Sequence, residues 1–589
     1  MHDRVFPAYP IRAPFSLYLG EVRARNKTSY QGVPLNGAPF ILVRFAKYGK
    51  QNDNEFMTTR DFLKTELKKA IFNLYGKEIN FEVAAEERFG DYATNAALVL
   101  RTGNPKEVAQ KLADKLRGSA RFNEYVEKTE VAGPGFLNFW LSHAALRRAF
   151  ESLGKKFPKK AGKINLEFIS ANPTGKLHIG HGRGAFYGDA LSRVFVYAGC
   201  RVDREYFIND SKESAQIKEL GKTALGEGTK YLTDYLSVKR KAQSAKLKNL
   251  QPIRQPADYK LQTNLYGEAG FLLAEEIQKD NKKFIEADLG IKFGKWYSEE
   301  GALRAKGIFE KTLTSLQKEK LVYEKDGAMW LKTAEFGDDE DRVVVRSDKS
   351  YSYFLSDITY HADKFKRGYK KVIDIWGADH HGHVKRMEAT KKMLGWKGDL
   401  NILISQLVTL KVGALRKKFS KRAGNVIYLE DLLREVGIDA LRWFFLDKAL
   451  NTHMDFDLEL AKKQSAENPV YYVQYAHARI SSILKNAKGG AKLKKRISIV
   501  GLQHPSELAL IKKLARFSEI VEDTAADYQV HRLTSYAYEL AYAFSGFYRD
   551  VRVLNSGENE AARIYLISET QKILKTVLGL LGINAPDKM

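Results

Sequence analysis

The sequence is poor in cysteine, and this scarcity excludes two kinds of site. Cys200 is the single cysteine among 589 residues. One thiol allows no disulfide within the chain and no zinc site built from several thiolates. A chain without structural disulfides fits a reducing compartment, so we expect a cytoplasmic protein.

Long apolar runs are also missing. A membrane-spanning helix needs roughly 20 consecutive apolar residues, and no stretch of the sequence approaches that length. We therefore expect no membrane among the partners. Hydrophobic residues nevertheless make up 44% of the chain, which at this length is enough for about two to four folded cores.

Acidic residues are too few to balance the basic ones. The chain has 97 Lys and Arg against 71 Asp and Glu, a formal net charge of +26. Two interpretations are open. The excess can reflect a lysine-rich composition that serves solubility, or it can serve a polyanionic partner such as nucleic acid, whose affinity would fall with added salt.

Two common nucleotide-binding motifs are missing as well. The chain contains no G-x-x-x-x-G-K-[ST] string, and "GHGRG" at 180–184 lacks the last glycine of a dinucleotide fingerprint. These absences exclude a P-loop and weaken the case for a dinucleotide site.

Turn residues and periodicity divide the chain into parts. Residues 1–56 have Pro and Gly punctuation without a sustained period, which favours a disordered extension or a start placed too early, with Met57 as the working start. Residues 57–150 predict a small α+β domain. Residues 164–455 alternate short apolar strands with helices, typical of a parallel α/β sheet, with a helical insertion at about 212–320. Residues 460–589 keep helical periodicity and predict a bundle.

Two histidines stand where a predicted strand feeds a predicted helix. The run "INLEFI" predicts a buried strand, "SANPTGKL" its exit turn, and the residues from His178 onward a helix. Such a helix N-terminus favours phosphate, because free N–H groups and the helix dipole attract anions. His178 and His181 fit a metal-binding pair, ordinary hydrogen-bonded side chains, or an H-x-G-H nucleotide site. Gly180 and Gly182 would let a ligand approach the backbone.

A basic loop far downstream favours the nucleotide interpretation. In "LRKKFSKRAGNV", Lys418, Lys421 and Arg422 surround Ser420, and Ala-Gly follows. This composition suits a flexible loop that closes on phosphates, although a solvated basic turn is the simpler alternative. The two elements in this order favour the phosphate loop.

Together the two elements resemble the HIGH and KMSKS-like motifs of class I aminoacyl-tRNA synthetases. Longer strings are similar to the arginyl-tRNA synthetase family of bacterial type: "EFISANPTGKLHIGHGRGAFYGDAL", "GDDEDRVVVRSD", "WGADHHGHV", "VGIDALRWFFL" and "LLGINAPDKM". The resemblance runs from about Met57 to Met589. It implies a class I Rossmann-like catalytic domain, an N-terminal additional domain that meets the tRNA elbow, and an all-α anticodon-binding domain named for "DALR" at 439–442.

The resemblance also implies a reaction. L-Arginine would attack the α-phosphate of ATP, accompanied by Mg²⁺, and the arginyl group would pass to the terminal ribose of tRNA-Arg. Such chemistry depends on positioning and charge stabilisation and needs no covalent nucleophile from the protein. We therefore expect no bound metal or prosthetic group. We also expect a monomeric enzyme.

Site residues follow from the resemblance position by position. It implies catalytic roles for His178, His181, Lys418 and Lys421, and ATP contacts for Gly180, Gly182, Gly377, Asp379, His380, Ser420 and Arg422. It implies arginine contacts for Glu167, Asn172, Tyr353 and Asp357, which suits a planar cation best met by carboxylates. It implies tRNA contacts for Phe136, Asn138, Tyr475 and Met589. Without the resemblance, Tyr353 and Asp357 would be interpreted as a pair on an ordinary helix face, with Asp357 in solvent.

Rival functions remain at this stage. A synthetase for cysteine lacks its thiolate zinc site here, and a leucyl enzyme lacks its long editing insertion. A catalytically silent tRNA-binding paralogue should have lost a motif histidine or loop lysine, and all are present. Lys176 departs from the family pattern, which commonly has proline there.

Overall fold

The computed structural model describes residues 57–86, 88–249, 259–413, 415–417, 426–487 and 497–589. The extension predicted for residues 1–56 lies outside them, and so do Lys418, Ser420, Lys421 and Arg422. Within the described part, no helix is both long and apolar enough to cross a bilayer.

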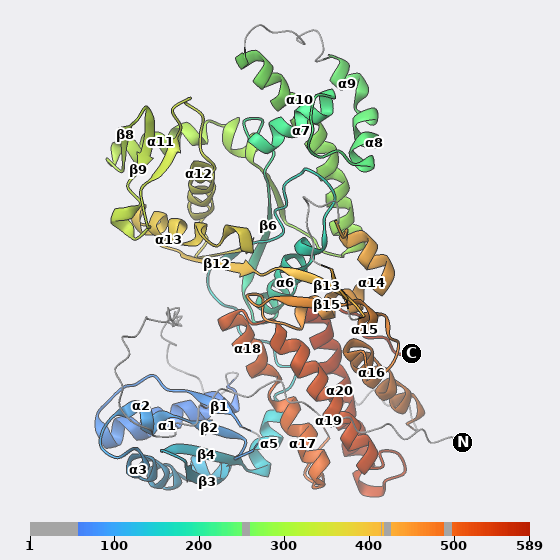
Figure 1. Ribbon diagram of the computed structural model, residues 1–589. Coiled ribbons are helices and arrows are strands. Elements are labelled where there is room, and N and C mark those ends of the chain that lie inside the picture. The colour runs from blue at the N-terminus through green and yellow to red at the C-terminus, as the bar shows by residue number, and fades with distance from the viewer. Residues whose placement is uncertain (1–56, 87, 250–258, 414, 418–425, 488–496) are drawn as a thin grey trace. The chain divides into compact units, whose positions relative to one another are not determined.

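The N-terminal part is an α+β unit. Helix α1 (Thr59–Tyr75) follows its N-cap residue Thr58, whose side chain accepts from the Asp61 amide in a capping box. Four antiparallel strands follow the order β1-β2-β4-β3, and helices cover them (Figure 1). The elements are β1 (Val83–Ala85), β2 (Tyr92–Thr94), α2 (Ala96–Leu100), α3 (Pro105–Arg117), α4 (Ala120–Tyr125), β3 (Val126–Ala132), β4 (Phe136–Leu141) and α5 (His143–Glu151).

A five-stranded parallel sheet forms the centre of the next part. Its order is β12-β11-β5-β6-β7, and every pairing is parallel. The strands are β5 (Lys163–Glu167), β6 (Arg201–Ile208), β7 (Lys295–Ser298), β11 (Lys371–Gly377) and β12 (Asp399–Ser405). Apolar runs such as "INL" and "VIDI" make these strands because both faces of a parallel sheet are covered. The fold class predicted from the sequence is confirmed.

Helices connect and cover this sheet. The helix predicted after the first strand is α6 (Ile179–Tyr197), and α12 (Tyr353–Lys366) leads into β11. The others are α11 (Ile308–Lys318), α13 (His383–Met393) and α14 (Leu429–Leu446). Two three-stranded sheets flank them: β8 (Val322–Lys325), β9 (Ala328–Leu331), β10 (Arg342–Val345); and β13 (Val408–Val412), β14 (Leu415–Lys417), β15 (Met454–Asp457).

The insertion predicted at about 212–320 is wrong at its C-terminal end. Strand β7 lies within that interval, yet it pairs in parallel with β6 at the edge of the central sheet. Four residues, "KWYS", are too few for a period-2 pattern to stand out among helical segments. The helices that separate β6 from β7 are α7 (Ala215–Leu225), α8 (Asp234–Ala242), α9 (Ser244–Asn249) and α10 (Tyr259–Lys283), followed by η2 (Phe284–Asp288).

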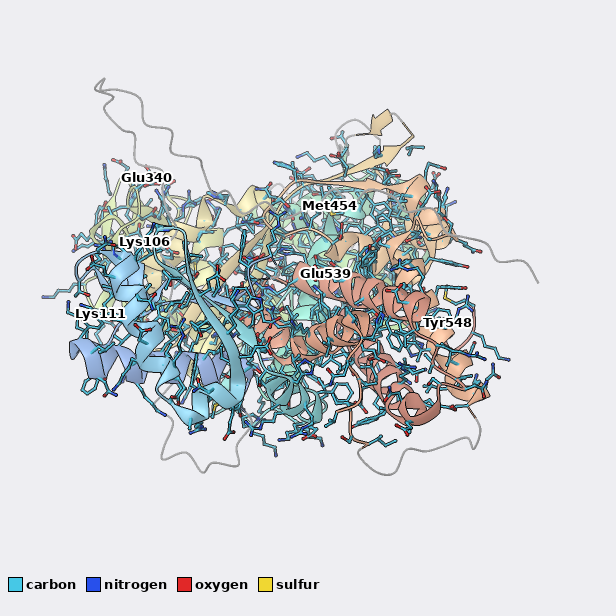
Figure 2. The ribbon with its side chains drawn as sticks, turned by 90° about the horizontal axis from the view of Figure 1, so that it is seen from below. Lys106, Lys111, Glu340, Met454, Glu539 and Tyr548 are labelled. Carbon is cyan, nitrogen blue, oxygen red and sulfur yellow. The ribbon has the colours of Figure 1, made fainter. Side chains whose placement is uncertain are left out.

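The C-terminal part is helical, as its periodicity predicts. It comprises α15 (Leu458–Lys462), α16 (Pro469–Asn486), α17 (Pro505–Ala515), α18 (Phe517–Asp527), α19 (His531–Asp550) and α20 (Glu560–Leu581). Helix α19 carries Glu539 and Tyr548 (Figure 2). The tail after α20 lies along α16, where His477 Nδ1 donates to the Pro586 carbonyl (2.8 Å) and Ser481 Oγ to Asp587 (2.9 Å).

Candidate active site

The described residues predicted to bind arginine or to contact ATP lie around the carboxyl ends of β5 and β11 and the neighbouring helices. Strand β5 is the middle strand, and the chain later returns to add β11 on its other side, so the strand order reverses between them. Glu167 ends β5 and Gly377 ends β11, and Glu167 is the register partner of Asp374. In open α/β sheets, ligands bind beyond the carboxyl ends of the strands at this switch point.

The two motif histidines cap the helix that follows β5. His178 is the N-cap residue of α6, and its Nδ1 accepts from the Gly180 amide (3.2 Å). His181 Nδ1 accepts from the His178 amide (3.1 Å), and the two rings lie 3.8 Å apart between centroids. Because Nδ1 is the acceptor in both rings, each neutral imidazole carries its proton on Nε2. Both rings thus place a donor nitrogen at the positive end of the helix dipole.

The two glycines predicted to contact ATP have different surroundings. Gly180 is exposed, and an added Cβ would meet only the His178 ring at 3.1 Å, so the backbone here is open to a ligand. Gly182 is buried, and a Cβ would lie 2.8 Å from Leu429 and 3.0 Å from Phe445. The reason inferred from the sequence for glycine at 182 is therefore wrong: close packing of α6 against α14 requires it.

The segment after the basic loop pairs directly with the histidine motif. The Ile179 amide donates to the Ile427 carbonyl (2.9 Å), and the Leu429 amide donates to the Leu177 carbonyl (3.0 Å). His178 and Tyr428 form an antiparallel bridge between them. Residues 427–429 thus lie beside the motif, and the basic loop at 418–425 lies outside the described residues.

The turn between β5 and α6 is backbone-strained. Ile169 has φ 70° and Ser170 has φ 36°, in the left-handed region that β-branched residues rarely adopt. Tyr206 Oη accepts from the Ala171 amide (3.0 Å), and Ser170 Oγ accepts from the Phe207 amide (3.1 Å), so neighbours hold the turn. Strain of this kind concentrates at functional sites. Asn172, predicted to contact arginine, is exposed in this turn.

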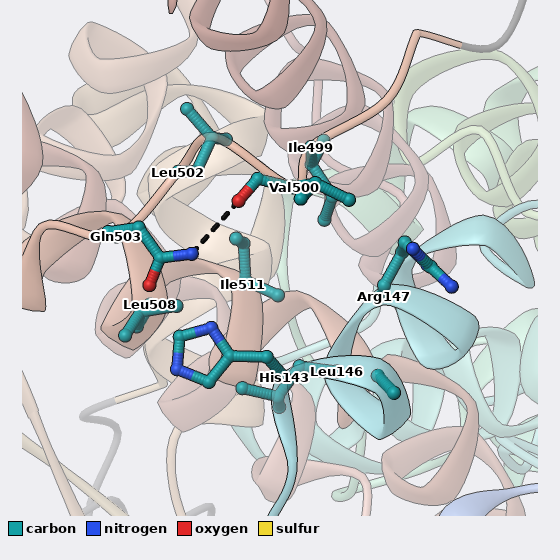
Figure 3. Close-up of a pocket in the computed structure, with 10 residues that line it drawn as sticks. His143, Leu146, Arg147, Ile499, Val500, Leu502, Gln503, Leu508 and Ile511 are labelled. Carbon is teal, nitrogen blue, oxygen red and sulfur yellow. Dashed lines mark hydrogen bonds between the residues drawn. The ribbon is translucent and has the colours of Figure 1, made fainter.

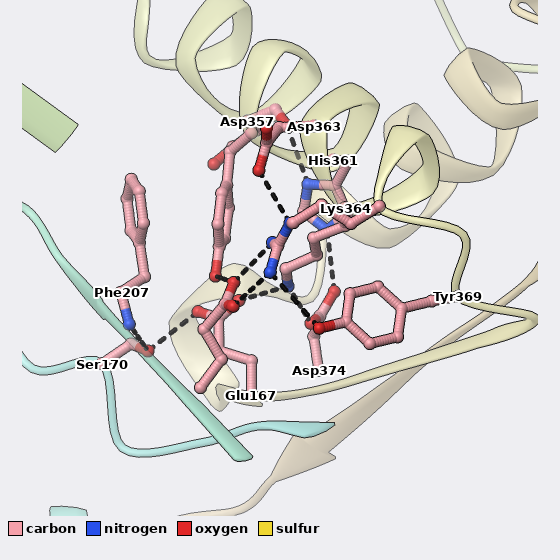
Figure 4. A network of polar contacts seen from close by, with 12 residues as sticks. Glu167, Ser170, Phe207, Asp357, His361, Asp363, Lys364, Tyr369 and Asp374 are labelled. Carbon is pink, nitrogen blue, oxygen red and sulfur yellow. Dashed lines mark hydrogen bonds and ion pairs between the residues drawn. The ribbon is translucent and has the colours of Figure 1, made fainter. Parts of the chain in front are cut away.

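Helix α12 presents four polar residues on one face, because they are spaced by three or four. They are Tyr353, Asp357, His361 and Lys364, and Figure 4 shows the last three. Tyr353 Oη lies 3.1 Å from Ser214 Oγ, next to α7. Asp357 Oδ2 lies 3.9 Å from His383 Nδ1 at the start of α13. Tyr353 is nevertheless 48% exposed, so contact of this face with arginine stays a prediction.

Asp357 is the titratable carboxylate of this face. Burial raises its pKa to about 7, because the opposing attraction of His361 is smaller than the effect of burial and the carboxylates of Glu167 and Glu299 add to the rise. Its side chain keeps 33% of its surface. A cation that bound here would favour the ionised form, which is what a guanidinium ligand requires.

Glu167 is buried and held by two neighbouring side chains. It is 5% exposed and accepts from Ser170 Oγ (2.8 Å) and from Lys364 Nζ (2.5 Å). Lys364 also donates to Asp374 (2.6 Å). Burial alone would lower the pKa of Lys364, but the two carboxylates outweigh it and hold that pKa above its ordinary value.

Sequence reasoning missed the partners of these acids. They are Glu299, His361, Lys364 and Asp374, of which Glu299 pairs with Arg304 at 3.2 Å. The positions of His361 and Lys364, four and seven residues after Asp357, could have indicated a shared helix face. Nothing in the local pattern of "VIDIW" or "WYSEE" distinguishes Asp374 or Glu299 from a solvated acid.

The segment predicted for the adenosine side follows β11. Gly377 and Asp379 are exposed, and His380 Nε2 lies 3.7 Å from Asp379 Oδ2. Trp376 lies 6.0 Å from the His380 ring between centroids. The segment therefore forms an open rim beside the end of the sheet.

Aromatic rings gather on the C-terminal helices. Tyr475 accepts from Arg479 (2.6 Å), and the Arg479 guanidinium lies over the rings of Tyr475 and Tyr548, 5.4 Å from each centroid. Tyr548 is 42% exposed and Met589 50% exposed. Sequence reasoning named Tyr475 and Met589 but missed Arg479 and Tyr548, which lie on two helices far apart in sequence.

Phe136 and Asn138 lie on β4 in the N-terminal sheet. Phe136 is half-buried, and Asn138 is 4% exposed between Ala93 and Glu130 of the neighbouring strands. Asn138 thus presents little surface, and its contact with tRNA stays a prediction.

A hollow of about 140 Å³ lies away from these residues. It lies between α5, the loop before α17, and α17 (Figure 3). Its walls are mainly apolar, with Leu146, Ile499 and Ile511 among them, and Gln503 Nε2 donates to the Val500 carbonyl (2.9 Å). None of the residues predicted for the site lines it.

Family models match three stretches of the chain. A DALR anticodon binding domain matches residues 473–589, an arginyl tRNA synthetase N terminal domain matches 58–141, and a catalytic domain of tRNA synthetases class I (R) matches 268–481.

Individual proteins are similar over most of the chain. An arginine–tRNA ligase 1 of Halalkalibacterium halodurans is 39% identical over 540 residues, 87% of this chain and 94% of that protein. An arginine–tRNA ligase of Geobacter sp. is 40% identical over 539 residues, 87% of this chain and 95% of that one. The arginyl-tRNA synthetase structure from Thermus thermophilus has the same fold, with a TM-score of 0.73, 23% identity, and coverage of 90% of this chain and all of that one. The chain therefore belongs to the arginyl-tRNA synthetase family of class I aminoacyl-tRNA synthetases.

Proposed function

We infer that the chain is an arginine–tRNA ligase. It activates L-arginine with ATP to arginyl-adenylate and pyrophosphate, and it transfers arginine to the 3′-terminal adenosine of tRNA-Arg. The observation that carries this inference is the meeting of a carboxylate cluster with a histidine-capped helix N-terminus at the switch point of the sheet. A cationic amino acid and a triphosphate would thereby meet beyond the carboxyl ends of β5 and β11.

The acids would hold arginine. Glu167 offers a fixed carboxylate, and Asp357 offers one that ionises when a cation approaches. A guanidinium presents paired donors in a plane, whereas an ammonium is a single compact charge. Tyr353 and Asn172 would complete the contacts, and the geometry of the paired donors would discriminate against lysine.

The motif helix would hold the triphosphate. The Nε2 protons of His178 and His181, together with the open backbone at Gly180, would meet phosphate charge as the arginine carboxylate attacks the α-phosphorus and pyrophosphate leaves. Mg²⁺ would arrive with ATP as part of the substrate. Lys418, Ser420, Lys421 and Arg422 would close on the phosphates, and Gly377, Asp379 and His380 would contact the adenosine.

The other parts would bind tRNA. We propose residues 57–150 as the domain that meets the tRNA elbow, 164–455 as the catalytic domain and 460–589 as the anticodon-binding domain. Exposed aromatic rings beside Arg479 support the last assignment, because rings stack on unpaired bases. We further propose a monomer that works in the cytoplasm.

Aminoacylation tests the function. The full chain would receive ATP, Mg²⁺, bulk tRNA and each amino acid in turn, and we expect charging with arginine alone. A chain that starts at Met57 should charge equally well if residues 1–56 are dispensable. Binding of tRNA without charging of any amino acid would support the silent paralogue, which no observation favours at present.

His181→Ala tests the site. We expect kcat to fall about 10²–10³-fold, as for loss of one preorganised donor, while the Kd for tRNA changes little. An equal loss of tRNA affinity would mean that the histidine only caps the helix.

A further inference from the structure

Lys364 is a buried cation between the two strands at the switch point. Its side chain is 0% exposed, and its Nζ donates to Glu167 on β5 (2.5 Å) and to Asp374 on β11 (2.6 Å). Glu167 and Asp374 are register partners, so two like charges would face each other without it. Figure 4 shows Lys364 reaching from α12 to both acids.

His361 links the helix to the strand. Its Nε2 lies 2.7 Å from Asp374 Oδ2, and its Nδ1 lies 2.7 Å from the Asp357 carbonyl oxygen. Asp374 belongs to β11 and Asp357 to α12, so the imidazole ring bridges the two elements.

The charged groups that face His361 come from three elements. They are Asp374 on β11, Glu167 on β5, and Asp357 and Lys364 on α12 itself. Lys364 pairs with both Glu167 and Asp374. Among the described residues, Asp357 has an ion-pair contact only with His383, at 3.9 Å, which leaves room for one cation from outside.

The same contacts determine where the two recognition acids lie. Glu167 is held by Lys364 on one oxygen and Ser170 on the other. His361 bonds the backbone of Asp357 to β11, so the turn of α12 that carries Asp357 is fixed to the sheet. A guanidinium that bridged Glu167 and Asp357 would need both acids in place before it arrived.

We propose that Lys364 and His361 are positioning residues for arginine recognition, which act through Glu167 and Asp357 without contact with the substrate. This role rests on the proposed function of those two acids. It predicts that loss of either side chain weakens arginine binding and leaves the chemistry on ATP largely unchanged.

Steady-state aminoacylation by full-chain variants tests the role of Lys364. We expect Lys364→Met to raise the KM for arginine at least tenfold, with kcat and the KM for ATP within threefold. In a Glu167→Gln background the same change should add less than twofold, because Lys364 acts through Glu167. Lys371→Met is the matched control, because Lys371 lies on β11 outside the cluster and donates to Tyr528 (3.1 Å). This variant should leave all three constants unchanged.

A second variant covers the case in which Lys364→Met does not fold. His361→Gln removes the bridge between α12 and β11, and we expect it to raise the KM for arginine at least tenfold with kcat within threefold. An unchanged arginine KM in His361→Gln would overturn the role of that residue. An unchanged arginine KM in Lys364→Met, beside a raised one in Glu167→Gln, would overturn the positioning role alone. Failure of the unaltered chain to charge arginine would instead contradict the proposed function.

Discussion

Two buried ionic clusters in this molecule differ in what borders them. The recognition cluster comprises Glu167, His361, Lys364 and Asp374, and the hub cluster comprises Asp189, Arg193, Arg204 and Arg442. Both join elements that are far apart in the sequence. Only the recognition cluster lies beside the predicted site residues.

The charged groups of the hub cluster are paired by other groups of the protein. Asp189 of α6 is 0% exposed and accepts from three guanidinium groups, including Arg442 of α14 at 2.7 Å. Arg442 also donates to the carbonyls of Leu289 (2.8 Å) and Leu581 (3.2 Å). The arginine of the DALR string thus ties α6 to the ends of η2 and α20.

The recognition cluster instead borders Asp357, a partly exposed carboxylate. Asp357 keeps 33% of its side-chain surface and has a pKa near neutrality. A buried ionic cluster therefore does not by itself mark a binding site. The hub cluster marks a junction of the fold, whereas we propose that the recognition cluster supports a binding site because it adjoins the partly exposed Asp357.

Arg442→Met should have the largest effect, and it acts on folding. Removal of one member of a buried ionic group leaves the others uncompensated, so we expect the free energy of unfolding to fall by about 3–5 kcal/mol. Urea denaturation followed by circular dichroism measures this. The KM for arginine of the folded fraction should not change; a tenfold rise would erase the distinction between the two clusters.

Asp357→Asn should act on recognition. Loss of a charged hydrogen-bond acceptor costs about 1.5–3 kcal/mol, so we expect the KM for arginine to rise about ten- to hundredfold with kcat little changed. Asp363→Asn is the matched control, because Asp363 lies on the same helix with 29% exposure but pairs with Arg367. Equal KM values for the two variants would remove Asp357 from the pocket.

The pH dependence of stability should have opposite signs at Asp357, beside the recognition cluster, and at Asp189 of the hub cluster. Because the pKa of Asp357 is about 7 in the folded protein, the KM for arginine should rise about tenfold between pH 8 and pH 6, as the carboxylate protonates. The folded state binds this proton more tightly than the unfolded chain, so this group's contribution to stability falls as the pH rises through 7. Asp357→Asn should flatten both profiles, and a wild-type slope in that variant would assign them elsewhere.

The hub cluster should show the opposite slope in acid. Burial alone would raise the pKa of Asp189, but Arg442, Arg193 and Arg204 outweigh it and hold that pKa below its ordinary value. Its stabilisation is present above the ordinary aspartate pKa and is lost as the pH falls through the lowered value. Asp189→Asn should therefore reduce the acid dependence of unfolding without altering the arginine KM profile.

Lys176→Ala should have the smallest effect. Lys176 Nζ lies 2.7 Å from Glu430, but the two side chains are 38% and 32% exposed. Exposed pairs contribute about 0–1 kcal/mol and are screened by salt. We expect a change in unfolding free energy below about 1 kcal/mol that disappears in concentrated NaCl. A persistent effect would mean that the pair aligns α14 with the histidine motif.

Local signals in the sequence were sufficient to predict the strand and the helix that carry the histidine motif. The apolar run 164–169, the turn residues after it and the glycine-rich helix predicted the strand-to-helix junction that the structure contains. Edge strand β7 was missed because four residues carry too little periodicity. The reason for Gly182 was misjudged because its neighbours, Leu429 and Phe445, lie more than 240 residues away in sequence.

By itself the sequence determined the fold class, the order of the helices and strands around the motif, and the family to which its strings are similar. Hydrophobic period, turn chemistry and motif spacing are local properties that a single chain displays directly. The tertiary structure alone decided which charges meet. Glu167 and Lys364 are separated by 197 positions and Asp189 and Arg442 by 253, yet each pair is in contact. The protonation and the strength of a carboxylate depend on burial and on neighbouring charges within a few ångströms, and no local pattern specifies either of these.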